Sequence, residues 1–196
     1  MNRLNQLKKR IDALYQGRRE GRADWADWLY EHHVFVVADK AGELAPHFGA
    51  NEELCRAAGM LHDVADAVMS RLAQGHEEKS AEIARDFLRE SGYQAGEVGI
   101  IVDDAIMRHS CRGIMPETPE GRVVATADAL VHITSDFYDR ALMAQFAAGM
   151  LPTESGNWAL QKIERDFNTK ILFPALKEQV RKEYELTKAR FKVLTE

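Results

Sequence analysis

Apolar residues recur every three or four positions along most of this chain, which is the spacing of one buried face of an α-helix. The clearest stripe lies within residues 51–73, at Leu54, Ala58, Leu61, Ala65, Val68 and Leu72. From such stripes, and from the prolines and glycines between them, we predict helices at roughly 2–17, 24–45, 51–73, 77–91, 96–110, 119–150 and 156–192, with Pro174 as a point where the last could break.

One short run, residues 34–37 (VFVV), has the composition of a strand. It lies between two helical patterns and no turn signal flanks it, so we predict that it is helical as well. The predicted fold class is therefore all-α, a helical bundle. We expect residues 1–150 to form the main domain with its N-terminal helix. Residues 151–196 should be a helical extension that packs on this domain or on a partner.

Composition narrows the class of protein. Of the 196 residues, 45% are apolar and 29% are charged, which suits a soluble chain with a full core. The formal net charge of −5 argues mildly against a nucleic acid as the main partner. A local cationic pocket or a bound metal could still hold a small phosphorylated molecule.

Cysteines and the N-terminus indicate the compartment. Cys55 and Cys111 form no CxxC pair, and no disulfide framework is implied. The start of the chain, MNRLNQLKKRIDALYQ, carries charges throughout and lacks the apolar core of a secretory signal. No segment approaches the ~18 apolar residues of a membrane span. We therefore expect a cytoplasmic protein without a membrane partner.

The strongest candidate for chemistry is the pair His62-Asp63, in the middle of the apolar run 58–66 (AGMLHDVAD). A buried carboxylate is costly unless it is paired, hydrogen-bonded or bound to a metal. Imidazole nitrogen and carboxylate oxygen together are natural ligands for a divalent cation. The alternative is a structural histidine beside an aspartate on the helix surface.

Two more polar residues lie on predicted apolar faces. Helical steps from His33 reach only apolar residues, whereas the same steps from His32 include Lys40 and Glu43, so His33 should face inward. Asp128 lies in the apolar run VVATADALV. Taken singly, each has a plain structural explanation, a core histidine bonded to a carbonyl or an aspartate paired with an arginine or an amide. Together with the His-Asp pair they favour a metal site among helices.

The order His33, then His62-Asp63, then Asp128, on separate helices, resembles the HD-domain metal-dependent phosphohydrolase superfamily. The resemblance covers roughly residues 24–140. It implies an HD-domain bundle in which these four side chains coordinate one divalent metal ion between helices. Such a ligand set admits Mn, Fe, Co, Ni, Mg or Zn. The main domain predicted above would then be the HD domain.

Two further histidines resemble those of some HD branches, including bacterial dinucleoside tetraphosphatases and cyclic-dinucleotide phosphodiesterases. His76 opens one predicted helix and His109 closes another. In those branches histidines at matching places complete a second metal site, which here implies two ions bridged by Asp63. The alternatives are a solvent-exposed residue for His76 and a cation favoured by the helix dipole for His109.

The resemblance also implies a mechanism, in-line attack on phosphorus by a water that the metal activates. Asp66, one turn after His62, is our candidate to hold or deprotonate that water. Arg112 and Lys79 are our candidates to stabilise charge on the phosphate, although either is more commonly a plain surface cation. Other members carry lysine or glutamate where this chain has Asp66, and the Gly-Tyr-Pro signature of the cyclic-dinucleotide enzymes is missing, which leaves the substrate open.

We therefore expect a metal-dependent phosphohydrolase that cleaves a phosphoester or pyrophosphate bond in a nucleotide or another small phosphorylated metabolite. The alternative is a non-catalytic HD domain that senses a nucleotide or a metal. In that case the apolar stripe of the predicted helix 156–192 would serve a partner or a homodimer, and ligand would bind without turnover. A purely structural helical protein is the third interpretation.

Overall fold

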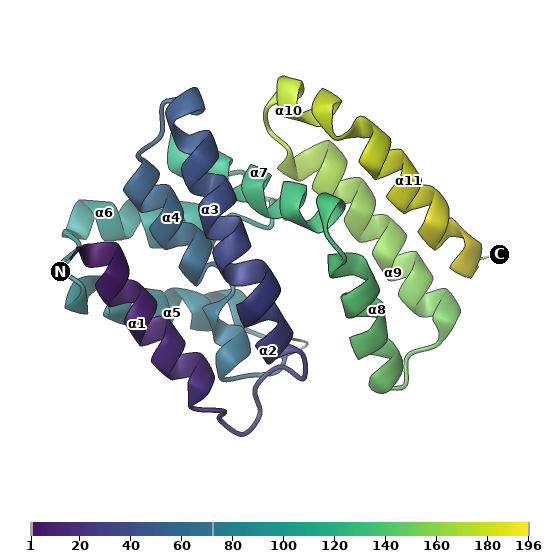
Figure 1. The fold of residues 1–196 in the computed structure, drawn as a ribbon, viewed down its shortest axis with the longest axis horizontal. Coiled ribbons are helices and arrows are strands. Elements are labelled where there is room, and N and C mark those ends of the chain that lie inside the picture. The colour runs from purple at the N-terminus through teal and green to yellow at the C-terminus, as the bar shows by residue number, and fades with distance from the viewer. Residues whose placement is uncertain (1, 72, 196) are drawn as a thin grey trace. The chain divides into compact units, whose positions relative to one another are not determined.

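The computed structural model describes residues 2–71 and 73–195, and within these ranges it contains helices and loops but no β-strand (Figure 1). The predicted all-α fold class is confirmed. The chain divides into two compact units, Met1–Ala127 and Asp128–Glu196. The predicted boundary after residue 150 stays a prediction. Among the described residues, no helix has both the length and the apolar character needed to cross a membrane.

The first unit is built from short helices. Its α-helices are α1 (Arg3–Gln16), α2 (Ala26–Leu29), α3 (Phe35–Leu44), α4 (Glu52–Leu61), α5 (His76–Glu90), α6 (Ala95–Gly99) and the first part of α7 (Pro119–Thr134). Two π-helical segments, Tyr30–Val34 and Ile100–Ile106, continue α2 and α6, and two 3₁₀ turns, Ala45–Phe48 and Val64–Ala67, follow α3 and α4. The run 34–37 is helical, as predicted.

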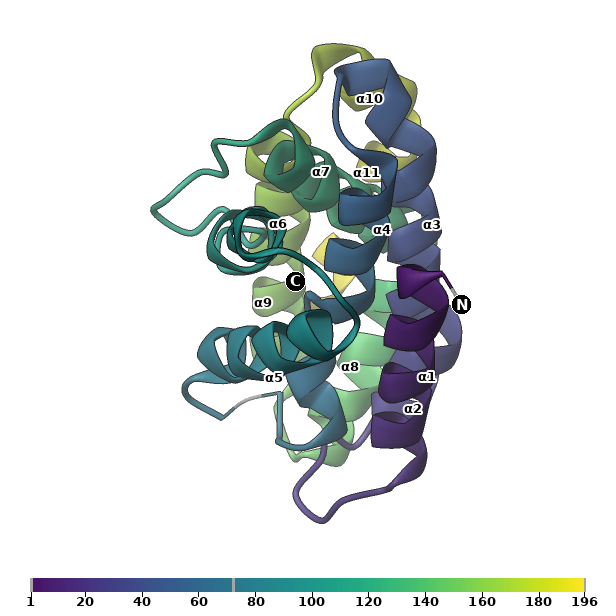
Figure 2. The ribbon, with the colours of Figure 1, turned by 90° about the vertical axis from the view of Figure 1, so that its left-hand side faces the viewer.

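The pairing of α3 with α4 organises the first unit, and α4 also contacts α1 and the π-helical segment Ile100–Ile106 (Figure 2). The two helices approach closely because Gly59 of α4 faces the backbone of Ala38 on α3. A Cβ on Gly59 would lie 2.6 Å from the Ala38 Cα. Only a glycine allows this separation, so Gly59 sets how closely α4 packs against α3.

The start of α4 is set by its cap. The Asn51 side chain accepts a hydrogen bond from the Leu54 amide (3.2 Å), and Glu52 and Glu53 place negative charge in the first turn. The predicted helix 51–73 is wrong beyond Leu61, where α4 ends. Leu72, the last position of its predicted stripe, lies outside the described residues.

The backbone changes conformation at the polar pair that follows α4. Successive residues of a helix point about 100° apart. Asp63 leaves the helix with φ −123° and ψ 26°, and a 3₁₀ turn then carries Asp66. Both carboxylates are buried. The end of α4 thus brings three buried polar side chains, His62, Asp63 and Asp66, into one short stretch of the chain.

The second predicted long helix, 119–150, is two helices, α7 and α8 (Phe137–Ala147). The Ser135 hydroxyl accepts a hydrogen bond from the Phe137 amide (3.2 Å), and such local bonds compete with helix continuation. The predicted helix 156–192 is also divided. It consists of α9 (Pro152–Arg165), a π-helical segment (Asp166–Lys170), α10 (Pro174–Gln179) and α11 (Arg181–Lys192), with Pro174 as the first residue of α10.

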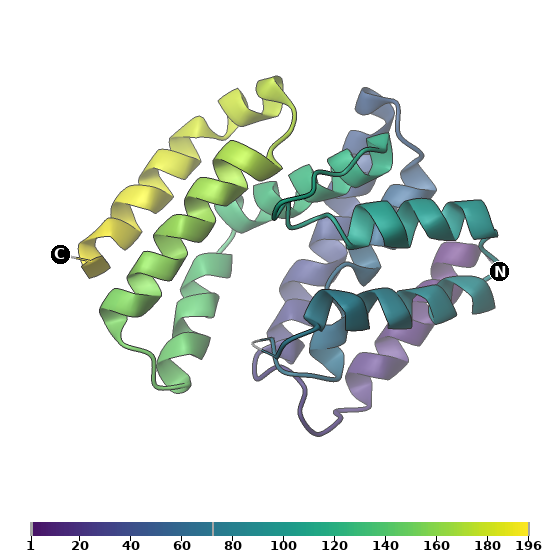
Figure 3. The same ribbon diagram turned by 180° about the vertical axis from the view of Figure 1, so that it is seen from behind.

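In the second unit α9 packs against both α8 and α11 (Figure 3). The Phe167 and Tyr184 rings stack with centroids 3.9 Å apart. The Tyr138 and Phe191 rings meet edge to face at 5.8 Å, and both are buried. Aromatic contacts therefore hold α8, the π-helical segment and α11 around α9.

Candidate metal centre

His62 lies directly after the last residue of α4 and is fully buried. Its Nδ1 lies 2.8 Å from the carbonyl oxygen of Gly59. Because a carbonyl oxygen only accepts, Nδ1 carries the proton and donates it there, and in the neutral ring Nε2 keeps its lone pair. This is the tautomer in which a histidine binds a metal through Nε2.

His33 reaches the same point from the π-helical segment Tyr30–Val34. It is fully buried and its neighbour His32 is exposed, so the predicted inward orientation is confirmed. Its Nε2 lies 3.3 Å from the Nε2 of His62, and the two rings meet edge to face. Two buried imidazoles thus direct ring nitrogens at one spot.

Asp63 and His109 complete this arrangement within the first unit. Asp63 Oδ2 lies 3.3 Å from His62 Nε2, and Asp63 Oδ1 lies 3.7 Å from His109 Nε2. The Nδ1 of His109 donates to the carbonyl of Ile106 (2.7 Å), so His109 has the same tautomer as His62. The two Nε2 atoms therefore flank one carboxylate, and all three side chains are buried.

Asp63 is ionised despite its burial. Burial raises the pKa of its carboxyl, but the positive charge of Arg71, the strongest opposing influence, outweighs this effect and holds the pKa well below its usual range. The site therefore offers a permanent negative charge beside neutral nitrogen donors. That combination is what a divalent cation prefers to bind.

The donor geometry fits a metal ion. Metal–ligand bonds of about 2.1 Å place neighbouring ligand atoms about 3.0–3.4 Å apart in octahedral or tetrahedral coordination. The separations of His62 Nε2 from His33 Nε2 and from Asp63 Oδ2 are both 3.3 Å. The residues present thus suit a divalent ion by charge, tautomer and spacing.

Asp66 lies next to this group and is fully buried. Its Oδ1 is 2.9 Å from His76 Nε2, and its Oδ2 is 2.5 Å from Arg71 Nη1. The other end of the same guanidinium is 2.6 Å from Asp63 Oδ2. Arg71 therefore links the two carboxylates, and His76 is placed on Asp66. The assignment of His76 as a metal ligand stays a prediction.

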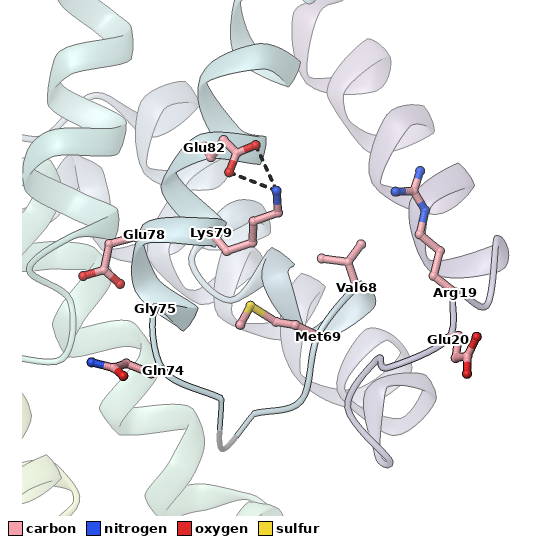
Figure 4. A pocket seen from close by; sticks show the side chains of 9 residues that line it. All are labelled: Arg19, Glu20, Val68, Met69, Gln74, Gly75, Glu78, Lys79 and Glu82. Atoms are coloured by element: carbon pink, nitrogen blue, oxygen red, sulfur yellow. Dashed lines mark hydrogen bonds and ion pairs between the residues drawn. The ribbon is translucent and has the colours of Figure 1, made fainter.

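Arg71 was not singled out from the sequence, because five residues after Asp66 it would face elsewhere on a continuous helix. The two cations that were singled out lie in other surroundings. Arg112 is exposed. Lys79 donates to both carboxylate oxygens of Glu82 (2.9 Å each) and lines an open pocket of about 580 Å³ beside Gly75 (Figure 4). Their contact with substrate stays a prediction.

In the second unit, Asp128 on α7 is buried, with 1% of its surface exposed. Its Oδ2 accepts a hydrogen bond from the ammonium group of Lys170, and its Oδ1 lies 3.1 Å from His132 Nε2. The sequence left open a partner such as an arginine or a backbone amide, and the structure shows that a lysine and a histidine are among its partners.

These partners belong to a larger buried network. Asp166 Oδ2 lies 2.9 Å from His132 Nδ1, and accepts hydrogen bonds from the Tyr138 hydroxyl (2.6 Å) and the Lys162 ammonium (3.0 Å). Burial lowers the pKa of His132 to about 3 and the pKa of Lys162 to about 8. Burial raises the pKa of Asp166, but Lys162, His132 and Lys170 outweigh it and hold that pKa below its usual range.

The two lysines and Asp166 are functional candidates that sequence patterns did not predict. A signal was present, because charged residues at positions 162, 166 and 170 repeat at the helical spacing of four, beside the buried Ile163 and Phe167. A charged stripe in a segment rich in lysine and glutamate is normally solvent-exposed, which hid this one.

Several curated proteins are similar in sequence to this chain. The chain is similar to curated proteins named Ribonuclease Y, with 35% identity over 99 residues to that of Thermotoga petrophila, which covers 50% of this chain and 18% of the relative. Identity is 30% over 114 residues to that of Fervidobacterium nodosum and 32% over 114 residues to that of Streptococcus agalactiae. Each of these two alignments covers 58% of this chain, and 20% and 19% of the respective relative.

The chain thus spans about a fifth of the length of these relatives. No solved structure matches it significantly. The family model of the HD domain matches residues 30–132, a segment that contains His33, His62-Asp63, His109 and Asp128. Because this match covers more than half of the 196 residues, the chain belongs to the HD-domain family.

Proposed function

We propose that this protein is a metal-dependent phosphohydrolase that cleaves a phosphoester or pyrophosphate bond in a small phosphorylated molecule, with a nucleotide as the favoured class. One observation carries the proposal. The Nε2 atoms of His62 and His109 flank the ionised, buried carboxylate of Asp63, and His33 adds a third imidazole. A structural core would not need this accumulation of lone pairs and negative charge.

The proposed ligands of the first ion are His33, His62, Asp63 and Asp128. Asp128 is included because it is buried and lies within the HD-domain match, although it opens the second compact unit. HD-domain proteins typically bind divalent metals, and this ligand set admits Mn, Fe, Co, Ni, Mg or Zn.

For a second ion we propose His76 and His109, with Asp63 shared between the two. When bound, such ions activate water for attack on phosphorus and neutralise phosphate charge.

The chain's own residues have two further proposed roles. Asp66, held by His76 and Arg71, is placed to take a proton from the attacking water. Arg71 keeps 26% of its side chain exposed, so its guanidinium can contact a phosphate oxygen as well as the two carboxylates. We propose Arg71 as the main phosphate-binding cation, ahead of Lys79 and Arg112.

The test is phosphate release from nucleotides, dinucleotides and sugar phosphates with Mn²⁺ added. The decisive variant is Asp63→Asn, which keeps the shape but removes the charge, and we expect turnover to fall by about 100-fold or more. Asp86→Asn on the exposed side of α5 is the matched control and should behave as the wild type. Equal turnover of Asp63→Asn and wild type would refute the proposal.

Similarity to Ribonuclease Y favours a second candidate, hydrolysis of a phosphodiester bond in RNA. The net charge of −5 weighs against extended RNA as the main partner, but not against a short oligonucleotide. Short RNAs therefore belong in the same panel. Mn²⁺ binding without turnover of any of these substrates would favour the third candidate, a sensor that binds without catalysis.

A further inference from the structure

Apart from Asp128, the buried polar network of the second unit has no role in the proposed reaction. We call it the Asp128 network, and it comprises Asp128, His132, Tyr138, Lys162, Asp166 and Lys170. Four of the six lie beyond residue 132, where the HD-domain match ends. The C-terminal helices therefore contribute groups that the family resemblance does not account for.

The network engages both oxygens of the Asp128 carboxylate. Lys170 donates to Oδ2, and His132 Nε2 lies 3.1 Å from Oδ1. None of the three side chains has more than 2% of its surface exposed. The hydrogen bond from Lys170 and the close packing of His132 restrict the rotation of this buried carboxylate.

His132 is itself held in place from the C-terminal side. Its Nδ1 lies 2.9 Å from Asp166 Oδ2, and the same oxygen receives the hydrogen bonds of Tyr138 and Lys162. Asp166 and Lys170 are the two ends of one π-helical segment. A single short segment thus supports both contacts of Asp128, one through His132 and one directly.

The charges of the network balance. Two carboxylates, Asp128 and Asp166, face two ammonium groups, Lys162 and Lys170. Buried ion pairs contribute little net stability compared with well-packed apolar side chains. An arrangement of five buried ionisable groups is therefore better explained by the position it gives to Asp128 than by stability.

We propose that the segment Asp166–Lys170 positions the Asp128 carboxylate for a divalent ion, with Asp166 acting through His132 and Lys170 acting directly. The inference rests on the proposed function, in which Asp128 is a metal ligand. These are positioning residues, since none of them is assigned to substrate. Groups that orient a metal ligand in this way typically change metal affinity by about 10–100-fold.

The experiment measures the affinity of the full chain for Mn²⁺, from the electron paramagnetic resonance signal of free Mn²⁺ during titration. Asp166→Asn keeps the side-chain shape and removes the charge that holds His132, and we expect it to weaken Mn²⁺ binding about 10–100-fold. Tyr138→Phe removes one hydrogen bond to Asp166 and should weaken binding by a smaller factor. Lys182→Met, on the exposed face of α11, is the control and should bind as the wild type.

Wild-type affinity in a folded Asp166→Asn variant would overturn the inference, even if the variant melts at a lower temperature, because the segment would then serve stability alone. If Asp166→Asn does not fold, the Mn²⁺ affinity of Tyr138→Phe is the test, and wild-type affinity in that variant would overturn the inference. Asp63→Asn separates this inference from the proposed function. If Asp63→Asn abolishes Mn²⁺ binding but Asp166→Asn does not change it, only the positioning role is wrong. If the wild type binds no Mn²⁺, both are wrong.

Discussion

Replacing Gly59 by alanine tests whether the close approach of α3 and α4 builds the candidate metal centre. A Cβ at this position would lie 2.6 Å from Cα, 2.9 Å from N and 3.2 Å from Cβ of Ala38. Normal carbon contacts are about 3.5–4.0 Å, so the helices would have to separate by about 1 Å. His62 follows the end of α4 and bonds to the Gly59 carbonyl, so it would move with the helix.

The expected change in the free energy of unfolding of Gly59→Ala is the difference between two opposing effects. Overpacking a close contact typically costs about 1–3 kcal/mol, whereas alanine in a helix gains about 0.5–1 kcal/mol over glycine. We expect a net loss of about 1–2 kcal/mol in the free energy of unfolding. With a urea dependence of about 2 kcal/mol/M, the midpoint should fall by roughly 0.5–1 M.

Urea denaturation followed by circular dichroism measures this effect, and Gly96→Ala is the matched control. A Cβ on Gly96 meets no atom within 4 Å, so that variant should be unchanged or slightly more stable. Adding Ala38→Gly to Gly59→Ala should not restore stability, because the closest atoms belong to the Ala38 backbone. A Gly59→Ala variant as stable as Gly96→Ala would refute the reasoning.

Three further predictions concern charge. Arg71→Met should lower the free energy of unfolding by about 1–3 kcal/mol, because it removes a bond to each of two buried carboxylates. In a thermal-shift assay, Mn²⁺ should raise the melting temperature of this variant more than that of the wild type. The folded-state pKa values of Asp63 and Asp166 are depressed, so their ionisation stabilises the fold above the unfolded pKa of about 3.9, and this stability is lost as the pH falls. In urea titrations from neutral to acid pH, the Asp166→Asn variant should therefore lose less free energy of unfolding than the wild type. An equal dependence of the free energy of unfolding on pH in both proteins would contradict this. Mn²⁺ at about 100 times its dissociation constant should stabilise the wild type by about 2.7 kcal/mol and Asp63→Asn much less, and equal melting shifts would exclude Asp63 as a ligand.

Periodicity and residue type predicted the all-α class and the inward orientation of His33, because both depend on local helix geometry. The partners of the buried charges were harder to predict. Arg71 meets Asp63 and Asp66 only because the chain leaves the helix after α4, and Lys170 meets Asp128 across 42 residues. Spacing rules hold within one element and give no access to contacts that the tertiary fold makes.

The early end of α4 shows how one departure from regular structure serves the candidate site. The apolar stripe continues past Leu61, so local pattern alone favours a longer helix. In such a helix His62 and Asp63 would point about 100° apart. Because Asp63 adopts φ −123°, its carboxylate turns back to within 3.3 Å of the His62 ring. The end of α4 is therefore where two consecutive polar residues come together at the candidate site, and an apolar pattern that is typical of a helix conceals it.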